Sequence, residues 1–350
     1  MSGRRRLEDA LQMGKEIDMR LDERDPSFRL NKISYVEDIE FGDIGATYSI
    51  NFSHDSQYFA AGCSNGAVQV YSVKQGKKKR PLQYGSNFGL PVTCVKFYPY
   101  NSSCLVTADS QGDIKFWDLM EWAQRGKILE KGNEIETLDF SHDGKIFATA
   151  GKDKTIRVYD SDSHAIIKTF PGAGISNEDD SEFREVGHGR KVFALKFHPF
   201  DDNVFITGGW DKCIKIWDTR SAHSVGTIWG PYVCGGDSLD ISMDNILTGS
   251  WVTDEALQIW DFKSGSLVET IPFPSEKGAF LYCARFVSSD LIAAGGSGSR
   301  DLKLLYRHTH EVAGCIDNSG KVVQALDVGD GGHLMVIGGA SDVLRLVRLL

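Results

Sequence analysis

The chain of 350 residues lacks the features that mark membrane and secreted proteins. It has no apolar run of membrane-spanning length, and residues 1–30 contain no hydrophobic signal region. Its seven cysteines are odd in number and form no Cys-x-x-Cys pair, which favours reduced thiols over disulfides or zinc ligands. We therefore expect a protein that is located in the cytoplasm, with the nucleus as the alternative, and that does not bind membranes.

Signatures of catalysis and of nucleic-acid binding are also scarce. The sequence contains no Gly-x-x-x-x-Gly-Lys-Ser/Thr phosphate loop and no His-Glu-x-x-His zinc motif. The formal net charge of −9 argues against nucleic acid as the main partner. These absences predict a protein that is not an enzyme, holds no metal ion or cofactor and has no small-molecule substrate. Other proteins, within a larger complex, are the expected partners.

The sequence does have a repeat. Each unit ends in an apolar, polar, apolar, aromatic pattern that is often followed by Asp, and equivalent positions lie 42 to 58 residues apart. The clear endings are Val68–Tyr71, Ile114–Asp118, Ile156–Asp160, Ile214–Asp218 and Leu257–Asp261, and the degenerate ones are Leu302–Leu305 and Leu344–Val347. A period of this length indicates a solenoid, a propeller or another repeat array.

Three short strand signals recur within each unit. In residues 192–218, runs of β-branched and aromatic residues are separated by turns at 200–203 and 210–211. On this pattern the sequence resembles the WD-repeat β-propellers over roughly residues 31–350. The resemblance implies an all-β fold in which seven blades, each an antiparallel sheet of four strands, form one closed ring.

The ends of the chain suggest how the ring closes. The seventh unit ends at Leu350, just past its third strand, and residues 35–41 are similar to the outer strand at 267–273. We therefore expect residues 33–41 to supply the fourth strand of blade seven and to cover its edge. Residues 1–30 are expected to form a separate tail, either disordered or a short amphipathic helix.

The resemblance also assigns a structural role to four polar or aromatic residues. His188, Thr207, Asp211 and Trp217 match the hydrogen-bonded tetrad that ties a blade together in this family. The resemblance therefore implies that this His-Asp-Thr set is not a catalytic triad. Only blade four has the full set. Blade three keeps Thr149 and Asp153 but has no equivalent histidine, so we expect packing to hold most of the ring together.

The same family binds peptides through two sets of top-face positions. One set, just before the turn that carries the Asp, places Trp210 in blade four and Trp251 in blade five. The other set, at the start of each innermost strand, includes Tyr48, Phe193, Tyr282, Glu136 and Asp237. Aromatic rings and carboxylates around one channel mouth suit a peptide with a basic side chain. The alternative is that the aromatic residues only fill the channel.

A second functional hypothesis rests on the end of blade four. Trp217, Asp218 and Arg220 are similar to the Trp-Asp-x-Arg box by which substrate receptors dock onto the adaptor of cullin-RING ubiquitin ligases.

The sequence also contains two charged segments. An acidic insertion at 178–185 is expected on the top face, and a basic run at 77–80 is expected on the bottom face beside blade one.

Overall fold

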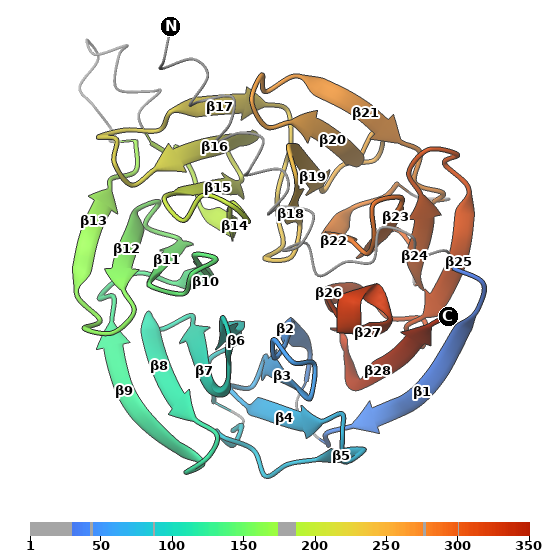
Figure 1. Ribbon diagram of the computed structural model, residues 1–350, viewed down its shortest axis with the longest axis horizontal. Coiled ribbons are helices and arrows are strands. Elements are labelled where there is room, and N and C mark those ends of the chain that lie inside the picture. Colours follow the sequence, from blue (N-terminus) through green and yellow to red (C-terminus); the bar gives the residue numbers. More distant parts are fainter. Residues whose placement is uncertain (1–29, 43–44, 87, 174–186, 276–277, 300) are drawn as a thin grey trace, which may run out of the picture.

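The computed structural model describes residues 30–42, 45–86, 88–173, 187–275, 278–299 and 301–350. Seven antiparallel sheets of four strands each are arranged around a central channel, with their strands in sequence order from the channel to the rim in six of them (Figure 1). The predicted seven-bladed, all-β propeller is confirmed. The described residues include no helix long and apolar enough to span a membrane.

The blades are numbered from the first complete sheet. Blade one consists of β2 (Thr47–Phe52), β3 (Tyr58–Cys63), β4 (Val68–Ser72) and β5 (Lys77–Lys78). Blade two consists of β6 (Val92–Tyr98), β7 (Asn101–Asp109), β8 (Asp113–Asp118) and β9 (Ala123–Leu129). Blade three consists of β10 (Ile135–Phe140), β11 (Ile146–Gly151), β12 (Ile156–Asp160) and β13 (Ile166–Phe170). Blade four consists of β14 (Val192–Phe197), β15 (Val204–Gly209), β16 (Cys213–Asp218) and β17 (Gly226–Trp229). Blade five consists of β18 (Leu239–Ser242), β19 (Asn245–Gly249), β20 (Leu257–Asp261) and β21 (Leu267–Ile271).

Blade six consists of β22 (Leu281–Phe286), β23 (Leu291–Gly296), β24 (Asp301–Tyr306) and β25 (Val312–Asp317). Blade seven consists of β26 (Val323–Gly329), β27 (Leu334–Gly339), β28 (Ser341–Leu349) and β1 (Ile33–Glu40), and a 3-10 turn at Asp330–Gly332 joins β26 to β27. We call the face that carries the turns between the second and third strands of each blade the top, and the opposite face the bottom.

Blade seven joins the two ends of the described chain. Strand β1 pairs antiparallel with β28, with Ile33 opposite Leu349 and Ile39 opposite Leu344. Ile39 is buried in the same apolar cluster as Leu344 and Ile50, so that β1 contributes to the core as well as to the sheet. The prediction that residues 33–41 complete blade seven is therefore confirmed. The tail predicted for residues 1–30 lies, up to residue 29, outside the described residues.

The core consists of apolar clusters between neighbouring blades. Between blades three and four, for example, Phe170, Phe197, Phe205 and Trp217 belong to one buried cluster. Each blade therefore buries both faces only because the neighbouring blades cover it. This burial stabilises the fold by about 25 cal/mol for each Å² of apolar surface removed from water.

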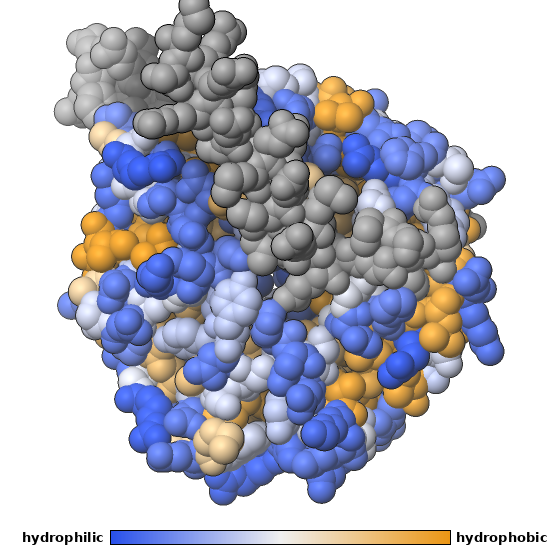
Figure 2. Space-filling model, in the orientation of Figure 1, coloured by the Kyte–Doolittle hydropathy of each residue, from blue (hydrophilic) through white to orange (hydrophobic). Residues whose placement is uncertain are grey.

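Apolar side chains remain exposed mainly at the rim. Ile166 and Ile167 on β13 are 53% and 52% exposed, and hydrophobic colour lies over that strand in Figure 2.

The structure describes one of the two predicted charged segments, the basic run, but not the acidic insertion. Lys77 and Lys78 form β5, directly after the turn that follows β4 on the bottom face. This is the face on which the basic run was predicted. The acidic insertion at 178–185 lies outside the described residues. All seven cysteines are free thiols, and four of them are buried.

Candidate functional site

The start of each innermost strand contains a recurrent irregularity. In six blades the register between the first and second strands shifts around one residue, which the partner strand therefore leaves unpaired. These bulged residues are Tyr48, Thr93, Glu136, Phe193, Tyr282 and Gln324. A bulge redirects a side chain out of the sheet's normal alternation. The family's second set of binding positions is thus built by a local backbone feature that repeats from blade to blade.

Trp210 and Phe193 form one aromatic pair on the top face of blade four. Trp210 lies in the turn between β15 and β16, is 42% exposed, and has its ring centroid 5.0 Å from that of Phe193. Its indole Nε1 points at Cys234 Sγ, 3.2 Å away. The ring is therefore exposed on one side and fixed on the other.

Trp251 belongs to a larger aromatic cluster on blade five. It is 37% exposed, and its Nε1 donates to the Tyr282 hydroxyl over 3.0 Å. The ring centroids of Phe280 and Tyr232 lie 4.9 Å and 6.5 Å from that of Trp251. Tyr232 and Phe280 were not predicted, because they lie in connections between blades, outside the repeated strand pattern.

Lys191 occupies the place that the sequence suggested for a ligand's cation. Its ammonium lies 5.1 Å from the centroid of the Phe193 ring, 2.6 Å from Glu136 and 3.3 Å from Glu134. Burial raises the pKa of Glu136, although the hydrogen bond from Lys191 opposes that rise. The structure thus contains an aromatic and acidic cation slot, formed by Phe193, Glu134 and Glu136, and a lysine of the same chain already lies in it.

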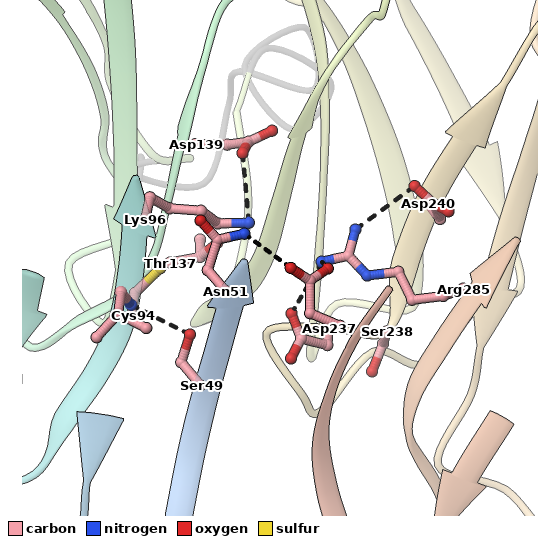
Figure 3. Close-up of polar contacts among 12 residues, drawn as sticks. Ser49, Asn51, Cys94, Lys96, Thr137, Asp139, Asp237, Ser238, Asp240 and Arg285 are labelled. Carbon is pink, nitrogen blue, oxygen red and sulfur yellow. Dashed lines mark hydrogen bonds and ion pairs between the residues drawn. The ribbon is translucent and has the colours of Figure 1, made fainter. Parts of the chain in front are cut away.

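Asp237 differs from the expectation of an acid at the channel mouth. It is only 6% exposed and is ion-paired with Arg285 over 3.3 Å, as Figure 3 shows. Burial raises its pKa, and Arg285 opposes that effect. Tyr48, 39% exposed, lies across the channel on blade one and shares a narrow cavity with Asp237, without ring contact to either aromatic cluster described above. Asp237 is therefore part of the channel interior.

A belt of six charged residues and one asparagine, which we call the charged belt, lines the lower half of the channel, with one residue from each innermost strand. Around the ring this charged belt consists of Asn51, Lys96, Asp139, Lys196, Asp240, Arg285 and Asp327. Cations and carboxylates alternate from blade two to blade seven. The belt borders a polar cavity of about 610 Å³ that extends to the bottom turns.

The acceptors of the charged belt tie neighbouring blades together. Asp139 accepts the backbone N–H of Phe197 over 3.0 Å, from blade three to blade four. Asp240 and Asp327 make the corresponding contacts to blades six and one, and Asn51 makes the contact to blade two. Each contact satisfies a backbone donor that faces the channel.

The cations of the charged belt are not equally paired. Arg285 lies within 3.3 to 3.7 Å of carboxylate oxygens of Asp237, Asp240 and Asp327, and Lys96 lies 3.4 Å from Asp139. Within the described part of the chain, Lys196 forms no ion pair. Figure 3 shows the pairs that involve Lys96 and Arg285.

The tetrad residues of blade four are hydrogen-bonded in a continuous chain. The fully buried His188 ring contacts Asp211 Oδ2 through Nδ1 over 2.7 Å and Thr207 Oγ1 through Nε2 over 2.6 Å. Trp217 Nε1 donates to the same threonine oxygen over 2.7 Å. The network connects the top connection to the second and third strands, as expected of a structural group.

Blade three has a different polar network, which adds to the packing that was expected to hold most of the ring together. The buried Glu130 carboxylate accepts from Tyr159 OH over 2.9 Å, from Arg157 Nη1 over 2.9 Å and from the hydroxyl of Thr149. Arg157 also contacts Asp153 over 2.6 Å. Glu130 precedes by one position the residue that aligns with His188, so that an alignment of the repeats does not reveal it.

Arg220 lies on the bottom face of blade four, away from both aromatic clusters. Its guanidinium donates to both carboxylate oxygens of Asp218, over 2.8 and 2.7 Å, and lies 3.2 Å from Asp201. The side chain is still 60% exposed. Trp217, by contrast, is buried in the tetrad, so that Arg220 is the accessible member of the Trp-Asp-x-Arg box.

Two groups that could suggest chemistry have structural explanations. Residues 62–66 have Gly-x-Ser-x-Gly spacing, but they span the end of β3 and the turn to β4, whereas a nucleophile elbow requires a strand-to-helix turn. His188, Asp211 and Cys213 could together hold a metal ion, but His188 uses both ring nitrogens within the tetrad.

Seven four-stranded blades, closure by the N-terminal strand and the network of blade four define a β-propeller of the WD-repeat type. A family model described as "WD domain, G-beta repeat" matches residues 42–72, 80–118, 126–160 and 181–218. These matched repeats, together with the seven-bladed ring, confirm the predicted resemblance to the WD-repeat β-propellers.

The chain is similar to several curated proteins. The WD repeat-containing protein slp1 of Schizosaccharomyces pombe is 23% identical over 290 residues, which cover 77% of this chain and 53% of slp1. The U3 small nucleolar RNA-associated protein 21 homolog of the same organism is 27% identical, over 57% of this chain and 20% of that protein. The human GATOR2 complex protein WDR24 is 22% identical, over 66% and 30%. The chain thus spans about half or less of the length of these relatives. WD-repeat proteins of this kind are often scaffolds or adaptors and are generally non-catalytic.

Proposed function

We propose that the protein is a non-catalytic scaffold or adaptor that binds an extended peptide segment on the top face of blades four and five. The main support for this proposal is the exposure of two tryptophans in adjacent top turns: Trp210 is 42% exposed and Trp251 is 37% exposed. Each ring is also held by aromatic neighbours and by its Nε1 contact. Exposed, pre-positioned tryptophans are typical of binding hot spots.

The proposed peptide carries a basic residue. The cation slot formed by Phe193, Glu134 and Glu136 has the composition that recognises an ammonium or guanidinium group. In the free protein Lys191 lies in this slot. A basic side chain of the peptide therefore has to displace the Lys191 ammonium. The free energy needed to move Lys191 out of the slot lowers the affinity of the protein for the peptide.

The comparisons support a protein partner within an assembly. Relatives carry names such as "GATOR2 complex protein WDR24" and "Cell division cycle 20.1, cofactor of APC complex". Their names support the assembly role only, because the chain spans 30% and 50% of those proteins.

The first test removes the two tryptophans. Peptides selected from a displayed library on the full chain should lose at least about tenfold in affinity for the W210A/W251A variant, because buried aromatic anchors contribute most of the binding energy. The matched control is I166A/I167A, which removes similarly exposed apolar side chains from the rim. Equal affinities of the two variants for the selected peptides would contradict the top-face proposal.

The second test determines the charge of the peptide through Lys191. Changing Lys191→Met removes the internal competitor, so that a peptide with a basic residue should bind more tightly, and most clearly at low salt. Calorimetry with the same peptides measures the change. Weaker binding by K191M would show that the ligand uses Lys191 as a partner, and the basic peptide would then be wrong.

The ubiquitin-ligase receptor is the second candidate, because Arg220 is 60% exposed and is oriented by both oxygens of Asp218. Capture of cullin-RING adaptor proteins that is lost with Arg220→Glu would support it. Arg125→Glu is the matched control, since Arg125 is also paired with the Asp that ends the third strand of its blade, Asp118, at the bottom of blade two. No adaptor recovered with the unmodified chain would exclude this candidate.

A further inference from the structure

A second cavity opens on the bottom face, between blades one and two. It has a volume of about 470 Å³ and is formed by the lower turns of the two blades together with the segment that follows β5. We call it the bottom pocket. Its lining residues are Asp55, Tyr58, Lys79, Arg80, Ser102, Ser103, Leu119, Met120 and Trp122.

The apolar walls of the bottom pocket are fixed in position. Tyr58, Leu119 and Trp122 pack against the buried cluster between blades one and two. The Trp122 indole donates to the backbone oxygen of Arg80 over 3.1 Å, and Trp122 has a φ of 55°, which is rare for a bulky residue. At the mouth, Met120 is 82% exposed. The pocket is therefore pre-formed, with a flexible apolar side chain at its entrance.

The charges around the bottom pocket are mostly positive. Arg80 is exposed, and its guanidinium forms no ion pair with any residue that the structure describes. The Lys79 ammonium contacts the neutral Gln75 over 2.7 Å and forms no ion pair with a described residue. The single carboxylate of the lining, Asp55, accepts hydrogen bonds from the Ser53 hydroxyl and from the backbone N–H of Gln57.

This absence of pairing is unusual on the bottom face. Arg125 of blade two and Arg220 of blade four also lie at bottom turns, and both are paired with the Asp that ends the third strand. The third strand of blade one ends in Ser72 instead, so that Arg80 has no such partner. Lys74 and Lys77, on the same hairpin, add to the positive charge.

We infer that the bottom pocket is a docking site for an acidic peptide segment that carries one large apolar side chain. The apolar side chain enters the pocket between Tyr58 and Trp122, and flanking carboxylates contact Arg80 and Lys79. Charge complementarity selects this occupant, because Arg80 and Lys79, neither of which is ion-paired with a residue that the structure describes, border a cavity with apolar walls at Tyr58, Leu119 and Trp122. The site goes beyond the proposed function, since it lies on the opposite face and takes a ligand of opposite charge.

The test uses the purified full chain and short labelled synthetic peptides in which a single Leu, Phe or Trp lies between glutamates. Anisotropy titrations should show saturable binding that weakens as salt rises. A peptide with Ala in place of the apolar residue should bind about tenfold more weakly, and a peptide with lysines in place of the glutamates should not bind.

Two exposed positions provide variants with little risk to folding. Arg80→Glu and Met120→Asp should each weaken the acidic peptide by about tenfold or more, while Arg125→Glu, at the neighbouring paired position, should leave it unchanged. W210A/W251A should also leave it unchanged, which separates this site from the proposed top-face site.

The inference is overturned by any of three results. Binding that survives both R80E and M120D would place the peptide elsewhere. Equal binding of the Ala-containing peptide would mean that only charge is recognised. R80E-sensitive binding to phosphatidylserine vesicles or to single-stranded DNA, without binding of the acidic peptides, would assign the basic surface to a membrane or a nucleic acid.

Discussion

Lys96 and Lys196 occupy equivalent positions on the innermost strands of blades two and four, but their electrostatic surroundings differ. Burial alone would lower the pKa of Lys96, yet the nearby Asp139 outweighs this effect and the pKa is raised. Burial, followed by the positive charge of Arg285, lowers the pKa of Lys196. The charged state is thus favoured by folding at Lys96 and disfavoured at Lys196.

This contrast predicts opposite effects of the same substitution. Lys196→Met should raise the free energy of unfolding near neutral pH, by about 1 kcal/mol, because it removes a charge whose desolvation on folding outweighs its attraction to Asp139 and Asp240. The gain should shrink as the pH rises towards the unfolded pKa of lysine, near 10.4, since the unfolded chain then also loses its proton. Urea unfolding at pH 7 and pH 10 measures the difference.

Lys96→Met provides the opposite arm of the experiment. It should lower the free energy of unfolding by about 1 to 3 kcal/mol near neutral pH, because it leaves Asp139 with a weaker set of partners. A raised pKa in the folded state stabilises below the unfolded pKa, and this contribution disappears only when the pH rises through the folded pKa. Changes of the same sign in K96M and K196M would refute the assignment of their surroundings.

The candidate site shows which properties of single residues could be predicted from the sequence. The positions of Trp210, Trp251 and Phe193 follow from their places in the repeat, because a turn or a bulge directs the same position in each blade. The ion pair of Asp237 could not be predicted, since Arg285 lies on the next blade. The occupation of the cation slot by Lys191 depends on side-chain packing that the repeat pattern does not encode.

At the scale of the blade, a polar network is kept although its residues change. In blade four the buried histidine connects Asp211 and Thr207, whereas in blade three Glu130 connects Arg157, Thr149 and Tyr159. Both groups satisfy buried donors and acceptors on the second and third strands of their blade. The family pattern predicts the first network and misses the second, because it specifies residue types at fixed positions.

The blade-three network predicts a large effect at Glu130. Glu130→Ala should lower the free energy of unfolding by about 3 kcal/mol, since it leaves two buried hydroxyls without their acceptor and Arg157 with Asp153 alone. Chemical denaturation measures the change. Glu121→Ala is the control, because Glu121 is 61% exposed and its loss should cost no more than about 0.5 kcal/mol. Similar costs for the two variants would mean that packing alone holds blade three.

At the scale of the whole molecule, the ring presents two candidate binding surfaces on opposite faces. The top-face slot has the chemistry for a basic peptide, and the bottom pocket has the chemistry for an acidic one. A rigid ring that binds two segments at once would fix their relative positions, which is a physical basis for a scaffold. A cytoplasmic location, with the nucleus as the alternative, stays a prediction.

The number of blades and the closure could be predicted from the sequence because both follow from local repetition. The bottom pocket could not, since it forms between two blades from turns that do not resemble one another. Ring closure leads to the last prediction. Strand β1 supplies the outer edge of blade seven and buries Ile39, so that its removal exposes the backbone of β28 and part of the core.

A chain that lacks residues 1–41 should therefore aggregate or unfold at lower temperature, whereas a chain that lacks residues 1–29 keeps every described contact of β1 and should keep nearly the melting temperature of the full chain. Size-exclusion chromatography and thermal denaturation of the two truncated proteins measure the difference. A third variant, Ile39→Asp in the full chain, separates the core contact from the edge: it should destabilise by about 2 to 5 kcal/mol while the edge stays paired. If the shorter truncation and the longer one are equally soluble and equally stable, β1 does not close the ring in solution.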